Sequence, residues 1–158
     1  MLSRDDFLSV VRLTPLVSID LIVTRPDGAA LVGRRVNRPA QGTWFVPGGR
    51  IRKDETLDDA FRRIVTDELG PEPGVSPLRR DAGFLGVYEH FYPDNFAGTE
   101  GIGTHYVVLA YRATVADTAQ PGQAAQHSAY RWMSPAELLA DPAVHDNTRA
   151  YFAGGTLL

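Results

Sequence analysis

The sequence contains no cysteine among its 158 residues. Disulfide bonds and thiolate metal sites are therefore excluded, and any metal ion would be bound through oxygen atoms or histidine nitrogen. The sequence also has no excess of positive charge, because 16 lysine and arginine residues stand against 19 acidic residues and leave a formal net charge of -3. This balance gives no electrostatic reason to expect nucleic acid or an anionic membrane as a partner.

Long apolar runs are absent as well. No stretch approaches the roughly 20 apolar residues that span a bilayer, and the first residues lack the basic and then apolar pattern of a signal peptide. The composition, 44% hydrophobic and 22% charged, is that of an ordinary globular protein. A chain of this length is sufficient for one domain with a sizeable core. We therefore expect a single cytoplasmic domain over residues 1–158.

The order of the predicted elements indicates an α+β or α/β fold, with strands arranged around one main helix. Apolar residues at helical spacing predict helices at 3–13, 56–69, 135–140 and 143–152. Runs rich in β-branched and aromatic residues predict strands at 16–24, 29–36, 43–46, 83–92, 104–115 and 130–133. The turn sequence between the first two strands predicts that they form a hairpin.

The main helix carries a carboxylate on its apolar side. That side is formed by Leu57, Ala60, Phe61, Ile64 and Val65. Glu68 follows Ile64 by four residues and therefore lies in the middle of the same stripe. A carboxylate in this position is costly unless it forms an ion pair or binds a metal ion. One interpretation is a salt bridge to an arginine such as Arg62 or Arg63.

A metal–phosphate site is the alternative, and the residues around the helix favour it. Gly48 and Gly49 form a turn before the helix, where the backbone can approach a ligand closely. Carboxylates beside a glycine turn suit a hard cation such as Mg²⁺ or Mn²⁺, which keeps several waters and shares a phosphate group. Arg50 and Arg63 could bind the remaining phosphate oxygens through bidentate hydrogen bonds.

The spacing of these residues resembles the Nudix box, G-x5-E-x7-R-E-U-x-E-E-x-G-U, in which U is an apolar residue. The positions in register are Gly49, Glu55, Arg63, Val65, Glu68 and Gly70. Three positions differ, since Ile64 and Asp67 each replace a glutamate and Pro71 replaces the last apolar residue. In an ordinary box the glutamate at position 64 would help to hold metal. Its loss implies fewer metal ions than many pyrophosphohydrolases of the family use.

Longer runs resemble one branch of the Nudix family, the GDP-mannose mannosyl hydrolases. They are residues 14–20, 37–50, 89–99, 104–109, 126–127, 130–132 and 145–152. The resemblance implies a Nudix fold, in which a mixed sheet is sandwiched between helices. It also implies hydrolysis of GDP-mannose, or a related GDP-hexose, at the anomeric carbon with inversion, giving GDP and free sugar. One Mg²⁺, which Mn²⁺ can replace, and a homodimer are further implications.

The resemblance assigns the metal and the base to particular residues. Gln126 would join Glu68 and the Gly48 carbonyl as metal ligands. His127 would be the general base that activates water, and the ordinary pKa of histidine suits this role near neutrality. The alternative for His127 is an exposed histidine in a loop.

Arginines would bind the departing diphosphate. Arg35 and Arg50 correspond to arginines of the branch that assist catalysis and bind substrate. Arg63 is a further candidate for substrate binding, although it could instead form an ion pair with Glu55. Arg38, in the run 37–50, is the remaining arginine candidate.

Three other residues, Asp20, His90 and Tyr106, match positions of the branch that meet the substrate. Phe7, in the first predicted helix, is a further candidate that could stack on guanine or lie at a dimer interface. Asp20 and His90 are expected to take part in catalysis, and Tyr106 and Phe7 are expected to bind substrate. The alternatives are an exposed strand position for Asp20, a hydrogen-bonded core histidine for His90, and core packing for the two aromatic residues. At the level of function, the alternatives are a pyrophosphohydrolase that gives a nucleoside monophosphate and a sugar phosphate, and a non-catalytic sensor of sugar nucleotides.

Overall fold

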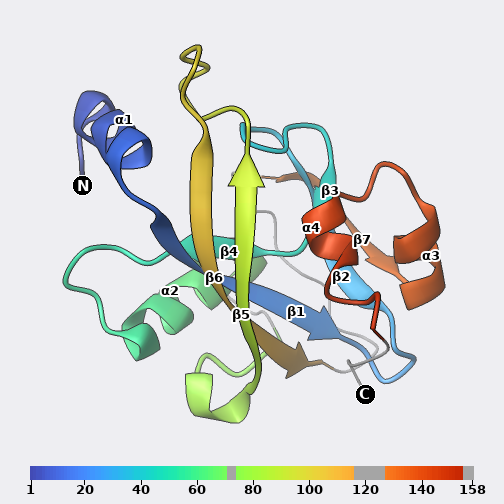
Figure 1. Ribbon diagram of the computed structural model, residues 1–158. Coiled ribbons are helices and arrows are strands. Elements are labelled where there is room, and N and C mark those ends of the chain that lie inside the picture. Colours follow the sequence, from blue (N-terminus) through green and yellow to red (C-terminus); the bar gives the residue numbers. More distant parts are fainter. Residues whose placement is uncertain (71–73, 116–126, 155–158) are drawn as a thin grey trace.

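The computed structural model describes residues 1–70, 74–115 and 127–154 (Figure 1). Its helices are α1 (Arg4–Leu13), α2 (Leu57–Leu69), the 3₁₀ turn η1 (Arg79–Asp81), α3 (Pro135–Ala140) and α4 (Asp146–Arg149). Its strands are β1 (Leu16–Thr24), β2 (Ala30–Arg35), β3 (Trp44–Phe45), β4 (Gly48–Arg50), β5 (Gly83–Tyr92), β6 (Thr104–Thr114) and β7 (His127–Met133). Among the described residues, no helix combines the length and the apolar character needed to cross a bilayer.

All seven strands belong to one mixed sheet, whose main path is β3-β2-β1-β6-β5. The central strand β1 is parallel to β6 along its whole length, from Leu16 opposite Tyr106 to Thr24 opposite Thr114. The long strands β5 and β6 are antiparallel, and β7 pairs with β2. This mixture of parallel and antiparallel pairs is the mixed sheet that the sequence predicts.

Strand β4 is not among the strands predicted from the sequence, which indicated a glycine turn at this point. Its three residues pair with β1, with Asp20 opposite Gly48 and Ser18 opposite Arg50. The predicted hairpin of β1 and β2 is present, but the two strands are in register only next to the turn, where Thr24 lies opposite Ala30. Beyond that point β4 takes the place of β2 beside β1, and this places the glycine pair in the middle of the sheet.

Helices cover both faces of the sheet, as expected (Figure 1). On one face, α2 packs its buried residues Ala60, Phe61, Ile64, Val65 and Leu69 against the sheet. On the other face, Leu138 of α3 and the chain around α4 form a second apolar cluster with β2 and β3. Leu57, expected on the apolar side of α2, is 38% exposed because it lies at the first turn of the helix.

Local signals place the ends of the helices. Ser3, Thr56 and Ser134 each accept a hydrogen bond at the start of their helix, and Ser134 completes a capping box with Glu137. The last helix is shorter than the predicted 143–152. Its preceding residues instead bond to β3, with Trp44 N–H donating to the Ala143 carbonyl and His145 N–H donating to the Trp44 carbonyl.

Candidate active site

A cavity of about 470 Å³ opens between α1, the segment that follows β2, β4 and the adjoining ends of β5 and β6. Segments that are far apart in the sequence meet there. The predicted site residues that line it are Phe7, Asp20, Arg35, Arg38, Gly48, Arg50, His90 and Tyr106. The structure therefore brings together most of the residues that the resemblance assigned to substrate and catalysis, although their roles stay predictions.

Asp20 lies on β1 at the inner wall of this cavity, and only 6% of it is exposed. Burial raises the pKa of Asp20 to about 7, against a hydrogen bond from Tyr151 and the positive charge of Arg35, which both act to lower it. The Tyr151 hydroxyl donates to Oδ2 of Asp20 at 2.6 Å. The same hydroxyl lies 3.4 Å from Nε2 of His90, so the three side chains form a buried polar cluster.

His90 lies on β5 with 4% of its surface exposed. Burial lowers its pKa to about 4, with a smaller effect from His145. The imidazole is therefore neutral near pH 7, and one of its two ring nitrogens donates while the other accepts. A neutral histidine at this wall can take part in hydrogen bonds to a substrate without adding charge.

Glu68 lies behind the glycine pair of β4 and is 3% exposed. Burial raises its pKa to about 7, against the positive charge of Arg35, while the negative charges of Asp67 and Asp20 add to the rise. The backbone N–H of Gly48 donates a hydrogen bond to the Glu68 carboxylate and lowers this pKa. Tyr130 on β7 also reaches this turn of α2, where its hydroxyl donates to the Glu68 carbonyl at 2.7 Å.

Gly48 cannot be replaced by a larger residue without moving the sheet. A Cβ atom at this position would lie 2.4 Å from Oδ1 of Asp20 and 2.7 Å from the Ile19 carbonyl oxygen. Two hydrogen bonds with β1 flank β4. The Leu21 N–H donates to the Pro47 carbonyl, and the Ile51 N–H donates to the Val17 carbonyl. In this antiparallel register, Gly48 is at a position whose N–H and C=O turn away from β1. The Gly48 backbone therefore faces the side on which Glu68 lies.

These groups fit the Mg²⁺ that the family implies. Glu68, Asp20 and the Gly48 carbonyl supply oxygen donors only, which is the donor type that Mg²⁺ prefers. No group of three or more acidic or histidine side chains within residues 1–70, 74–115 and 127–154 could hold a metal ion by itself. A bound Mg²⁺ would therefore need backbone, water or substrate oxygens in addition, and such mixed coordination is usual for this ion.

Arginines and aromatic rings form the outer part of the cavity. The Arg50 guanidinium lies over the ring of Phe7, 4.4 Å from the centroid, and burial lowers the pKa of Arg50. The ring of Phe7 is 4.7 Å from that of Phe96, which follows β5. Arg35 is held at its Nε by the Pro39 carbonyl at 2.9 Å. Arg35 and Arg50 thus present positive charge to the same cavity, a suitable arrangement for an anionic group such as a diphosphate.

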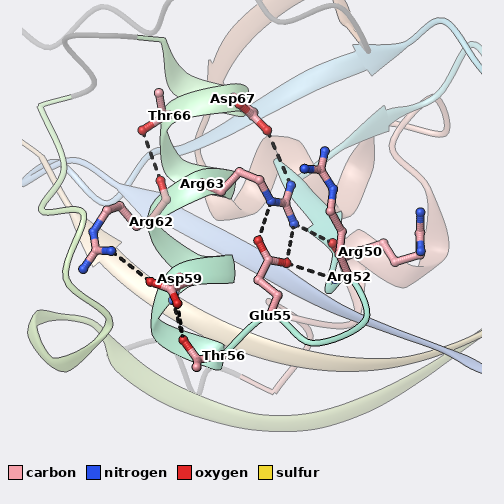
Figure 2. Close-up of polar contacts among 9 residues, drawn as sticks. All are labelled: Arg50, Arg52, Glu55, Thr56, Asp59, Arg62, Arg63, Thr66 and Asp67. Atoms are coloured by element: carbon pink, nitrogen blue, oxygen red, sulfur yellow. Dashed lines mark hydrogen bonds and ion pairs between the residues drawn. The ribbon is translucent and has the colours of Figure 1, made fainter. Parts of the chain in front are cut away.

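Arg63 does not line this cavity but joins the loop of the box to the helix. Figure 2 shows its guanidinium between Glu55, Asp67 and the backbone of Arg50. It donates to the two carboxylate oxygens of Glu55 at 2.7 and 3.0 Å and to the Arg50 carbonyl at 2.8 Å. The hydrogen bond from Arg63 is the main cause that lowers the pKa of Glu55 to about 2. Of the two roles expected for Arg63, the ion pair with Glu55 is present, and binding of substrate stays a prediction.

Ile64 occupies the place of the missing glutamate of the box. It is 1% exposed and belongs to the core cluster beneath α2. A Cβ atom on Gly49 would lie 3.0 Å from its Cγ1. The side chain at position 64 therefore packs directly under the glycine pair, one helical turn before Glu68.

His127 and Gln126 are at the margin of what the structure describes. His127 begins β7, and its backbone lies opposite Arg35 of β2. Its side chain lies outside the described part of the structure, and its role as general base stays a prediction. Gln126 lies outside the described residues.

Several cavity or supporting residues were not predicted from the sequence. Asn37 and Tyr92 line the cavity, and Tyr92 could have been found because it alternates with His90 along β5. Phe96 could not be predicted in the same way, because its place at the cavity depends on where the loop after β5 lies. Tyr151, which holds Asp20, lies within the last predicted helix, 143–152, and nothing in that helical pattern indicates a contact with Asp20 on β1.

Comparison with known proteins identifies a family match over most of the chain. The model of the NUDIX domain matches residues 14–153. The low-salt glycan biosynthesis protein Agl8 of Haloferax volcanii is 41% identical over 114 residues, which are 72% of this chain and 67% of that protein. The ADP-ribose pyrophosphatase of Methanocaldococcus jannaschii is 36% identical over 76 residues, 48% of this chain and 41% of that protein.

A solved structure gives the same result for the fold. The MutT NUDIX hydrolase of Burkholderia pseudomallei superimposes with a TM-score of 0.64 at 26% identity, covering 89% of this chain and 97% of that one. The predicted fold, a mixed sheet between helices, is therefore confirmed.

Proposed function

This chain belongs to the Nudix family, and we propose that it hydrolyses GDP-mannose, or a related GDP-hexose, at the anomeric carbon of the sugar. The products would be GDP and free sugar of inverted configuration. The reaction would depend on Mg²⁺, which Mn²⁺ could replace, and the protein would act as a cytoplasmic homodimer. More generally, the matches to Nudix proteins support hydrolysis of a nucleotide derivative.

The main observation in favour of this proposal is the apolar side chain at position 64. The family box provides a glutamate there, and Ile64 instead packs into the core. The box of this chain is left with Glu68 facing the glycine pair, because Glu55 is engaged by Arg63. Fewer carboxylates suit a single cation that neutralises a leaving diphosphate better than a group of cations that activates water for attack on phosphorus.

The residues around the cavity suit displacement at carbon. Such a displacement has a transition state with oxocarbenium character, and its leaving group carries negative charge. Arg35 and Arg50 can stabilise the departing diphosphate, and a bound Mg²⁺ would supply further positive charge to it. In this proposal the carboxylate of Asp20, which lines the cavity, would stabilise positive charge that develops on the sugar. The proposal assigns the proton of the attacking water to His127, and a His127→Ala variant with unchanged turnover would exclude that assignment.

The relatives support the class of substrate at different levels of detail. Agl8 is named for glycan biosynthesis, a process that uses activated sugars. The pyrophosphatase acts on ADP-ribose by its name, and this favours the alternative for this chain, cleavage between the two phosphates of a sugar nucleotide.

A panel of GDP-, ADP- and UDP-sugars, assayed with Mg²⁺ and with the products identified, tests the proposal. We expect GDP and free hexose from GDP-mannose or a close analogue. A nucleoside monophosphate with a sugar phosphate would establish the alternative reaction. Binding of GDP-mannose with no turnover in either Mg²⁺ or Mn²⁺ would indicate a sensor instead.

A further inference from the structure

Tyr151 lies behind the wall of the cavity, just after α4, and is 1% exposed. It is not a lining residue, yet its hydroxyl contacts two residues that are. That hydroxyl donates to Oδ2 of Asp20 at 2.6 Å and lies 3.4 Å from Nε2 of His90. No feature of the Nudix box involves this residue, which is more than 80 positions further along the chain.

We propose that Tyr151 is a positioning residue that fixes the carboxylate of Asp20 and the imidazole of His90 for the reaction in the cavity. This inference rests on the proposed function, because it assumes that Asp20 and His90 act on bound substrate. Tyr151 itself touches no substrate, and its effect passes through the two side chains that it holds.

The geometry around Asp20 leaves the carboxylate little freedom. Its Oδ2 accepts the bond from Tyr151, and its Oδ1 lies so close to the Gly48 backbone that a Cβ atom there would be 2.4 Å away. Both oxygens are therefore constrained, one by a side chain and the other by the backbone of β4. Loss of the tyrosine hydroxyl would leave only the second constraint and would allow the carboxylate to rotate.

The same hydroxyl, 3.4 Å from Nε2 of His90, is also placed to favour one tautomer of that histidine. Because the Tyr151 hydroxyl donates its only hydrogen to Asp20, its oxygen is left to accept from Nε2–H of His90. His90 is then held in the tautomer whose Nδ1 is an acceptor. The resulting chain runs from His90 through Tyr151 to Asp20, so that one residue sets the orientation of both.

Tyr151 is itself held firmly. Its ring is 4.7 Å from that of Tyr88 on β5, in an edge-on arrangement. The adjoining turn of α4 is joined to the cavity wall, because the Val46 N–H donates to Oγ1 of Thr148 at 3.3 Å. The C-terminal segment therefore supports the cavity at Val46 and at Asp20.

Four variants of the full chain test this inference: Tyr151→Phe, Asp20→Asn, the double variant and Tyr88→Phe. Tyr151→Phe keeps the ring and removes the hydroxyl, whereas Tyr88→Phe removes a hydroxyl from the neighbouring ring and serves as the matched control. We expect Tyr151→Phe to lower kcat by about 10- to 100-fold with less than about a threefold change in KM, because catalytic groups lose their alignment. Tyr88→Phe should keep the wild-type kcat.

The double variant distinguishes positioning from a general structural effect. If Tyr151 acts through Asp20, the double variant should be about as active as Asp20→Asn alone. Wild-type kcat in Tyr151→Phe, or losses that multiply in the double variant, would overturn the inference. So would a loss of activity that merely follows a fall in the melting temperature, which is measured for every variant.

The product analysis of the wild-type enzyme keeps this test separate from the proposed function. If GDP and free sugar form, the proposed function stands and the variants judge Tyr151 alone. If a sugar phosphate forms instead, the proposed function fails, and the same four variants are compared in that reaction. A wild-type protein that turns over no sugar nucleotide would overturn both proposals.

Discussion

Two side chains one helical turn apart on α2 have opposite chemical character in similar surroundings. Ile64 and Glu68 are 1% and 3% exposed, and both face the glycine pair of β4. Ile64 adds apolar contact to the core, whereas Glu68 is a carboxylate with a raised pKa. At the scale of single residues, the chemistry proposed for this site depends on that difference.

Replacement of Glu68 tests whether its carboxylate binds the metal ion. Glu68→Gln keeps the shape of the side chain but removes the negative charge, so we expect Mg²⁺-dependent turnover to fall by at least about 100-fold. The stability of the metal-free protein should be unchanged or raised, because a neutral amide is less costly to bury than a carboxylate. Assays in Mg²⁺, together with melting temperatures in EDTA and in Mg²⁺, measure both effects.

Asp58→Asn is the control for this variant, since it removes an exposed carboxylate from the same helix. Its activity should stay within about a factor of three of wild type. Full activity in Glu68→Gln would show that this carboxylate does not hold the cation.

Replacement of Ile64 tests whether the side chain at position 64 is enclosed by the core. Ile64→Glu restores the residue of the family box, and in metal-free solution we expect it to lower the free energy of unfolding by about 2–4 kcal/mol, because it buries a charge in the core. Ile64→Val should cost only about 1 kcal/mol. Urea unfolding in EDTA measures both. An Ile64→Glu variant as stable as wild type would mean that this side chain can reach solvent or the cavity after all.

At the scale of elements, the loop of residues 50–55 is joined to α2 by one ion pair. Glu55 and Arg63 are 13% and 22% exposed in their side chains, and two hydrogen bonds connect them (Figure 2). The pair holds the loop that follows the glycines against the helix that carries Glu68. We therefore expect it to support the geometry of the site as well as the fold.

This pair predicts a pH dependence of stability. The folded pKa of Glu55 is about 2, below its ordinary value of 4.5. Its contribution is therefore present above pH 4.5 and is lost as the pH falls towards 2. Glu55→Gln should lower the free energy of unfolding at pH 7 by about 1–3 kcal/mol. The difference from wild type should shrink between pH 4.5 and 2, as followed by urea unfolding.

Asp59→Asn provides the comparison on the same helix. Its ion pair with Arg62 is more than half exposed on both sides, so its loss should cost less than about 1 kcal/mol. A Glu55→Gln variant with a similarly small, pH-independent cost would contradict the role given to the buried pair.

The elements differ in how far the sequence predicts them. The ends of α2 were predictable because Thr56 and Gly70 act on the backbone a few residues away. Strand β4 was not, because the extended form of Gly48 to Arg50 depends on pairing with β1, which is distant in sequence. The late start of α4 was not predictable for the same reason. The residues before it form hydrogen bonds with the backbone of Trp44, which is distant in sequence, and are not helical.

At the scale of the whole molecule, the cavity is where separate segments of the chain converge. The resemblance indicated Asp20, Arg35 and His90 individually, and the fold brings all three to the lining of one cavity. The contact of Tyr151 with Asp20 joins residues 131 positions apart. Neither local pattern nor the family box specifies such a contact, so it could be found only from the folded structure.

The central claim, that water attacks carbon and not phosphorus, is tested most directly by hydrolysis of GDP-mannose in ¹⁸O-labelled water with Mg²⁺. The phosphate products carry the decisive information, because the anomeric oxygen of a free sugar exchanges with water. Mass spectrometry should find GDP without label, since the bond broken is between carbon and oxygen. Labelled GDP, or labelled GMP or mannose phosphate, would place the attack on phosphorus and contradict the account.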